Sequence, residues 1–204
     1  MDRQAAMHRI SRAIFGGPIG RLTARAMEKG NAATEREAVT TLAPNESDAV
    51  LVIGFGPGLG IHHLAPRLPA GWIGGIDPSA VMHKRATTLN AAAIDNGRVT
   101  LKRATTTAIP WPDDTFTAAI SVNTLQLWYP LPDSAREVAR VLRPGSRLVT
   151  LTHDWALARS GGGSADAWLD SARDELRNNG FGDIEHWRGE SENHGVIALC
   201  ATVA

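Results

Sequence analysis

Short apolar runs alternate with longer amphipathic stretches along most of this chain. Apolar runs bounded by glycine, proline or asparagine indicate buried strands, and we expect strands at residues 49–53, 71–76, 98–103, 117–122, 147–152, 182–188 and 195–203. Apolar positions at helical spacing predict helices at residues 1–41, with a break at Gly16-Gly17-Pro18, and at residues 58–68, 79–95, 132–142 and 165–179. Because strands and helices alternate, the pattern predicts an α/β fold, in which helices cover both faces of a mostly parallel sheet.

The first predicted strand runs directly into a series of glycines. Residues 54–60 read Gly-Phe-Gly-Pro-Gly-Leu-Gly, and Asp77 follows the next predicted strand. Glycine has no Cβ, so the chain can turn sharply and a ligand can approach the backbone, while the following helix offers unpaired N–H groups. A carboxylate at the end of the second strand can accept hydrogen bonds from both hydroxyls of a ribose. Together these segments predict a site for a nucleotide-type cofactor; the alternative is a glycine-rich turn that binds nothing.

The spacing of the glycines disfavours a dinucleotide. A dinucleotide-binding loop has the pattern G-x-G-x-x-G, but its third glycine would fall on Leu59 when counted from Gly54, and on Ile61 when counted from Gly56. A nicotinamide-dependent oxidoreductase is therefore a less favoured hypothesis.

The pattern that the chain does have, G-x-G-x-G-x-G, resembles motif I of the class I S-adenosylmethionine-dependent methyltransferases. Further segments are similar to the methyltransferase type 11 or ubiquinone-biosynthesis-like group of that family, namely those from Phe15 to Gly20, Ala108 to Phe116, Val122 to Trp128 and Arg140 to Leu148. The resemblance implies a Rossmann-like sheet of seven strands in the order 3-2-1-4-5-7-6 with the last strand antiparallel, S-adenosylmethionine as cofactor, and methyl transfer as activity. It covers nearly the whole chain, so we expect residues 1–204 to form a single domain, with the helical segment 1–41 packed near the cofactor site.

The same resemblance assigns roles to individual residues at the carboxyl ends of the strands. It implies that Asp77 binds the ribose hydroxyls and that the backbone carbonyl of Asn123 lies near the cofactor's ammonium group. For Asn123, a side chain that caps a turn is an equally weighted alternative. The remaining implied contacts are the methionine and ribose contacts Gly54, Phe55, Gly56 and Gly58, and the adenine contacts Pro78, Met82, Thr105 and Thr106.

Two positions depart from the family's pattern. Val52 stands where motif I usually carries an acidic residue, and Thr105 stands where an aspartate usually contacts the adenine. If each lost contact is a charge-assisted hydrogen bond of about 1.5 to 3 kcal/mol, cofactor binding could weaken by roughly a hundredfold or more. Thr105 keeps a hydroxyl that can accept from the adenine amino group, so we expect modified cofactor binding. The alternative is a non-catalytic domain, or one with altered cofactor binding, on the same fold.

The chemistry of methyl transfer needs few catalytic side chains. A sulfonium methyl group is already activated, and alignment of the nucleophile alone can supply roughly 7 to 11 kcal/mol. A general base is needed only when the acceptor must lose a proton. His153 is the favoured candidate for that base because it follows the fifth predicted strand, with Tyr129 and the pair His62 and His63 as further candidates. The alternative for His153 is a hydrogen-bonding role within a loop.

Aromatic residues follow the third, fourth and fifth predicted strands. Trp111, Trp128, Tyr129 and Trp155 would then gather at one edge of the sheet, and buried aromatics of this kind line apolar pockets. We therefore expect a small, largely apolar organic acceptor. For each tryptophan, sealing a loop onto the core is the alternative.

Composition agrees with a globular enzyme. The 204 residues are 43% hydrophobic, enough for one sizeable core, and 21 basic against 21 acidic side chains provide no field that attracts nucleic acid. We expect no membrane insertion and a cytoplasmic location, because no run approaches the roughly 20 apolar residues that span a bilayer and Arg3, Arg9 and Arg12 interrupt the N-terminal region. The single cysteine, Cys200, cannot form an intramolecular disulfide and is expected to pack in the core. No spacing of ligand residues predicts a metal site, and the sequence makes no prediction about oligomeric state.

Overall fold

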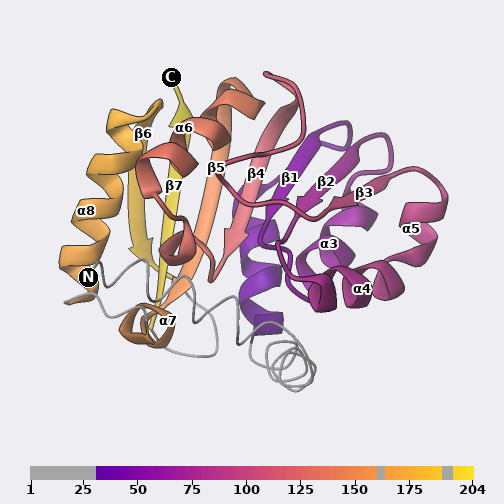
Figure 1. Cartoon of the computed structure of the whole chain (residues 1–204), viewed down its shortest axis with the longest axis horizontal. Helices are drawn as coiled ribbons and strands as arrows, with labels where there is room; N and C mark the ends of the chain where they lie inside the picture. Colours follow the sequence, from indigo (N-terminus) through magenta and orange to yellow (C-terminus); the bar gives the residue numbers. More distant parts are fainter. Residues whose placement is uncertain (1–30, 160–163, 190–194) are drawn as a thin grey trace.

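A single sheet organises the part of the chain that the computed structural model describes, residues 31–159, 164–189 and 195–204 (Figure 1). The strand order is β3-β2-β1-β4-β5-β7-β6, with β7 antiparallel to both of its neighbours and the other neighbouring pairs parallel. This order and the antiparallel strand confirm the predicted fold. The strands are β1 Ala49–Ile53, β2 Trp72–Ile76, β3 Val99–Lys102, β4 Phe116–Val122, β5 Leu142–His153, β6 Phe181–Arg188 and β7 Val196–Val203.

Helices cover both faces of the sheet. A helix over residues 31–42 precedes β1; it is the indigo helix of Figure 1 and carries no label there. The labelled helices and 3-10 turns are α3 Leu59–Leu64, η1 Ala65–Arg67, α4 Ala80–Leu89, α5 Ala91–Asp95, η2 Leu125–Leu127, α6 Leu131–Val141, α7 Asp154–Arg159 and α8 Ala165–Asn178.

Two predicted helices are each divided in the structure. The helix expected at residues 58–68 ends at Leu64 and continues as the 3-10 turn η1, because Pro66 lacks the N–H that a longer α-helix would use. The helix expected at residues 79–95 breaks at Asn90, whose side chain donates to the carbonyl oxygens of Gly58 and Ala86. Asn90 thereby ties the end of α4 to the glycine loop after β1.

Alternate residues of β1 pack into two separate apolar clusters. Val50 and Val52 face the cluster that includes helix 31–42, α3 and α4, and Cys200 packs there as expected. Leu51 and Ile53 face the opposite cluster, which includes α6 and α8. Burial of both faces explains why the strand reads as a continuous apolar run instead of an alternating one.

Two predictions lie outside the described residues. These are the helical break at residues 16–18, with the neighbouring motif at residues 15–20, and the structure of the segment before residue 31. Within the described part of the chain, no helix is both long and apolar enough to span a bilayer.

Candidate functional site

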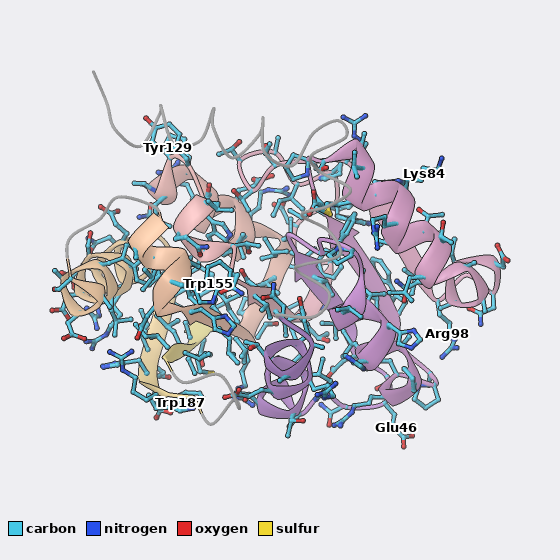
Figure 2. The ribbon with its side chains drawn as sticks, turned by 90° about the horizontal axis from the view of Figure 1, so that it is seen from below. Glu46, Lys84, Arg98, Tyr129, Trp155 and Trp187 are labelled. Carbon is cyan, nitrogen blue, oxygen red and sulfur yellow. The ribbon has the colours of Figure 1, made fainter. Side chains whose placement is uncertain are left out.

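The carboxyl ends of the parallel strands meet at one edge of the sheet. The strand order reverses between β1 and β4, since β2 and β3 lie to one side of β1 and β5 lies beyond β4. In open α/β sheets, ligands bind outside the carboxyl ends of the strands at such a reversal. This edge is the lower one in Figure 1, and Figure 2 views the molecule from that side.

The glycine loop after β1 is held by its own backbone. The N–H groups of Gly54 and Phe55 both donate to the carbonyl oxygen of Ile76, at 2.8 and 3.2 Å, and the N–H of Gly58 donates to that of Phe55 at 2.9 Å. Gly54, Gly56 and Gly58 have φ values of 66°, 51° and 97°. Side chains rarely adopt this left-handed region, so the loop conformation itself favours glycine at all three positions.

Protein atoms also fill the space beside two of these glycines. A Cβ on Gly54 would collide with the Thr124 side chain, and a Cβ on Gly58 would lie 2.6 Å from Nδ2 of Asn90 and 2.9 Å from Ala86. Packing against the loop after β4 and against α4 therefore accounts for these two glycines without any ligand. We had expected their missing side chains to make room for the cofactor, and the structure supplies a different reason.

Asp77 joins the glycine loop to the start of α4. Its Oδ2 accepts from the N–H of Gly56 at 2.9 Å, and its Oδ1 accepts from the N–H of Ser79 at 2.8 Å. The side chain is only 8% exposed, and this burial raises the pKa of Asp77 to about 6 against the opposing effect of the two N–H donors. Each carboxylate oxygen keeps a further acceptor site, so Asp77 can still bind the two hydroxyls of a ribose.

The residues predicted at the adenine face come from two loops. Met82 is buried in α4, whose N-cap is Ser79, and Pro78 is exposed just before it. Thr105 pairs with the hydroxyl of Thr107 at 3.1 Å, and the hydroxyl of Thr106 donates to Ser134 on α6 at 2.8 Å. The hydroxyls that were expected to replace the missing aspartate are thus engaged within the protein.

His153 lies at the centre of a buried polar network. Its ring is 1% exposed, with Nε2 3.2 Å from the hydroxyl of Thr34 and Nδ1 3.1 Å from Oδ1 of Asn123. The backbone N–H of His153 donates to the same Oδ1 at 2.9 Å, and Nδ2 of Asn123 donates to Oδ1 of Asn31 at 3.1 Å. The network links helix 31–42 to the carboxyl ends of β4 and β5.

This network favours a structural role for His153 over the expected role as a general base. Both ring nitrogens have hydrogen-bond partners within the protein. Burial lowers the pKa of His153, and this shift by itself is compatible with either role. The structure favours the alternative in which His153 stabilises the packing of the loop. The side chain of Asn123 likewise contributes to the packing of the loop. The backbone carbonyl oxygen of Asn123 accepts from Nε2 of Gln126 at 2.8 Å. Among the other candidate bases, His62 and His63 lie on α3 and Tyr129 precedes α6.

The three tryptophans do not share one edge of the sheet. Trp111 packs against Trp72 and Phe116, with ring centroids 6.2 and 5.2 Å away, and covers Gly74. Trp72 and Phe116 are the first residues of β2 and β4, so Trp111 lies toward the amino ends of the strands and the predicted position is wrong. The reason is packing: the Phe116 ring fills the space beside Gly74, and the indole of Trp111 packs against that ring and the same glycine.

Trp128 and Trp155 do follow the carboxyl ends of β4 and β5. Trp128 is buried, and its indole N–H has no hydrogen-bond partner in the described part of the chain. Trp155 is 47% exposed and stacks on His153, with ring centroids 5.3 Å apart. In Figure 2 Trp155 lies near the middle of the view and Tyr129 near its upper margin.

Sequence reasoning missed three polar residues on the buried face of helix 31–42. Asn31, Thr34 and Glu35 are buried together with Ala38, Val39 and Leu42. These six positions follow the three- and four-residue spacing of one helix face. Polar residues that continue an apolar stripe were the signal that could have identified them.

Comparison with known proteins identifies a methyltransferase domain within the chain. Residues 50–145 match the sequence profile described as a methyltransferase domain. The chain is 28% identical over 109 residues to YdaC of Bacillus subtilis, an uncharacterised methyltransferase, in a segment that covers 53% of this chain and 58% of YdaC. Residues 50–145 of this chain therefore form a methyltransferase domain. The aligned segment spans little more than half of YdaC. The similarity therefore concerns this segment and not the whole of either protein.

Solved structures show the same fold at low sequence identity. An S-adenosylmethionine-dependent methyltransferase from Aquifex aeolicus matches 89% of this methyltransferase and 97% of its own chain, with a TM-score of 0.70 and 16% identity. A methyltransferase from Haloferax volcanii, solved in complex with the Trm112 activator, matches 89% of this chain and 93% of its own, with a TM-score of 0.72 and 17% identity. At such identities the likeness shows the fold alone.

The residues of this methyltransferase fit its family's cofactor. Asp77 offers acceptors for ribose hydroxyls beside a loop whose left-handed backbone is already formed. Among residues 31–159, 164–189 and 195–204, no three side chains of His, Cys, Asp or Glu gather as metal ligands.

Proposed function

We propose that this methyltransferase transfers the methyl group of S-adenosylmethionine to a small, largely apolar organic acceptor at the carboxyl edge of the sheet. The observation that carries the proposal is the juxtaposition of two features at that edge. Asp77 and the glycine loop form the cofactor side, and Trp155, stacked on His153 but 47% exposed, offers an aromatic surface beyond β5. The indole N–H of Trp128 adds a buried donor without a partner among the described residues.

The protein's part in the reaction is positioning. The bound cofactor supplies a methyl group that is already activated by its sulfonium. Asp77 holds the ribose and, through Gly56 and Ser79, fixes the loop that would face the rest of the cofactor. Helix 31–42, held by the His153 network, excludes water from the ends of β4 and β5. Because His153 is engaged, we propose that the acceptor atom reacts without an imidazole base.

A small acceptor fits the charge balance better than a nucleic acid does. The chain carries 21 basic and 21 acidic side chains, whereas proteins that bind nucleic acid present a basic patch or stripe. The Trm112 partner belongs to the Haloferax volcanii protein and gives no acceptor for this chain.

The first experiment measures thermal shifts with S-adenosylmethionine, S-adenosylhomocysteine and NAD. A ligand at 100 times its dissociation constant stabilises the folded state by about 2.7 kcal/mol, so we expect a shift with the first two ligands and none with NAD. The buried Val52 leaves β1 without an acidic contact, and the absence of any shift would favour the rival hypothesis of a non-catalytic domain.

The second experiment identifies the acceptor class. The full chain is incubated with S-adenosylmethionine and, separately, with small aromatic or aliphatic compounds, with RNA and with DNA, and S-adenosylhomocysteine formation is measured by chromatography. We expect turnover only with small organic compounds. Turnover restricted to nucleic acid would overturn the proposed acceptor class and leave the family assignment intact.

A further inference from the structure

The first strand carries no acidic residue that could contact the cofactor. Val52 occupies the position where the family's motif I usually carries a carboxylate, and it is 4% exposed within the apolar cluster that also contains Ile61 and Ala38. An ammonium group bound beside Val52 would have no negatively charged partner on β1. The same face of the sheet, however, receives a carboxylate from another element.

That carboxylate belongs to Glu35 on helix 31–42. A Cβ on Gly60 would collide with Oε2 of Glu35 and would lie 3.7 Å from Cδ1 of Ile120. Gly60 is in the first turn of α3, directly after the glycine loop, and Ile120 is the partner of Val52 on the adjacent strand. The Glu35 carboxylate therefore lies against the first turn of α3, close to Ile120, the strand partner of Val52.

The helix that carries Glu35 is held in register. Thr34, the preceding residue, contacts Nε2 of His153, and Asn31, one turn earlier, accepts from Asn123. Both contacts join helix 31–42 to the carboxyl ends of β4 and β5. These contacts consequently hold the helix segment that carries Glu35 against the carboxyl ends of β4 and β5.

Among the described residues, Glu35 has no partner that would balance a buried charge. Its side chain is 8% exposed, and neither carboxylate oxygen has a hydrogen bond or an ion pair within the described ranges. Burial alone raises the pKa of Glu35 to about 8. None of the other titratable groups on its own helix and the neighbouring elements contributes to this shift: Arg36, Glu37, His62, His63, Asp77 and His153. An uncompensated buried carboxyl is costly to ionise, and a cation bound beside it would remove that cost.

We propose that Glu35 binds the ammonium group of S-adenosylmethionine, so that helix 31–42 supplies the acidic contact that the family usually takes from β1. The inference rests on the proposed use of S-adenosylmethionine by this chain. It adds a cofactor contact from a residue outside the matched segment 50–145. The glycine at position 60 follows from the same arrangement, because any side chain there would displace the carboxylate.

Proton release on binding tests the proposal in the wild-type protein. Glu35 with a pKa of about 8 is mostly protonated at pH 7, and an ammonium beside it favours the ionised form. Binding of S-adenosylhomocysteine, which keeps the ammonium, should therefore release close to one proton, about 0.9 by the titration relation. Isothermal titration in two buffers of different ionisation enthalpy measures this number. No proton release in the wild-type protein would overturn the proposal even if every variant failed to fold.

A matched pair of variants and a second ligand test whether the proton release and the affinity depend on a contact between Glu35 and the ammonium group. E35Q should bind S-adenosylhomocysteine about ten- to a hundredfold more weakly and release almost no proton, because a neutral amide replaces a charged contact. E46Q, the same substitution at an exposed position, should behave as wild type. 5′-Methylthioadenosine keeps the ribose and adenine but lacks the ammonium, so wild type and E35Q should bind it equally.

The outcomes separate the contact from the cofactor site itself. Unchanged affinity and unchanged proton release in E35Q would show that Glu35 does not contact the ammonium. Equal weakening for both ligands in E35Q would assign it to the structure of the site and also overturn the proposal. If the wild-type protein bound neither ligand, cofactor use by this chain would fail, and the role of Glu35 would fail with it.

Discussion

Asp77 has two tasks that a single carboxylate can perform at once. It fixes the glycine loop and the start of α4 through the N–H groups of Gly56 and Ser79, and we propose that its remaining acceptor sites bind the ribose hydroxyls. Asp77→Ala should lower the affinity for S-adenosylhomocysteine about ten- to a hundredfold, because at least one charge-assisted hydrogen bond of roughly 1.5 to 3 kcal/mol is lost. Calorimetric titration of the folded variant measures this change. Unchanged affinity would place the ribose elsewhere.

The environment of His153 predicts a structural effect instead of a catalytic one. His153→Ala removes the ring that connects Thr34 with Asn123 and leaves buried polar groups unpaired, so unfolding in urea should show a loss of about 1 to 3 kcal/mol. Turnover should depend on pH in the same way in the wild type and in the variant. A fall in kcat of about 10² or more with unchanged stability would restore His153 as a base.

At the scale of elements, the glycine loop depends on its backbone conformation. Gly56→Val should abolish binding of S-adenosylhomocysteine and destabilise the fold, because φ at this position is 51° and a left-handed residue with a Cβ costs roughly 1 to 2 kcal/mol. Gly97→Val is the matched control, since Gly97 has a φ of 78° and open space around it. Both variants should lose stability in urea, and only Gly56→Val should lose the ligand. Normal binding by folded Gly56→Val would exclude the loop from the site.

Helix boundaries show where element prediction from sequence reaches its limit. The N-terminal start of α4 was predictable, because the hydroxyl of Ser79 caps its own helix by accepting from Met82. The break at Asn90 was not, because its side chain bonds to Gly58, 32 residues away. A local pattern reports local hydrogen bonds, whereas a break imposed by a distant loop leaves no mark in the helix itself.

At the scale of the whole molecule, two buried carboxyls make stability depend on pH. The pKa of Glu35 is about 8 in the folded state and 4.5 as the ordinary value, so between these limits the folded state binds more protons than the unfolded state does. Stability of the free protein should therefore rise as pH falls from 8 to 6, by on the order of 2 kcal/mol from Glu35. Asp77 acts in the same direction between its folded value of about 6 and 3.8.

Urea unfolding at the two pH values measures this difference. E35Q should lose most of it, and E46Q should keep it. A wild-type protein that is equally stable at pH 6 and pH 8 would contradict the assigned environment of Glu35.

The sequence by itself determined the sheet and the glycine loop after its first strand, and the resemblance to known methyltransferases implied the strand order. Apolar runs and turn residues are local features, the glycines with φ values of 51° to 97° stand at the positions where the chain must turn, and the motifs that imply the strand order lie within continuous segments. Only the tertiary structure decided the surroundings of His153, Trp111 and Glu35. His153 meets Thr34 across 119 residues, Trp111 covers a glycine of β2, and Glu35 reaches a loop on another element. Such contacts depend on how elements pack against one another, because a side chain acquires its partners, its burial and its pKa only when distant parts of the chain come together.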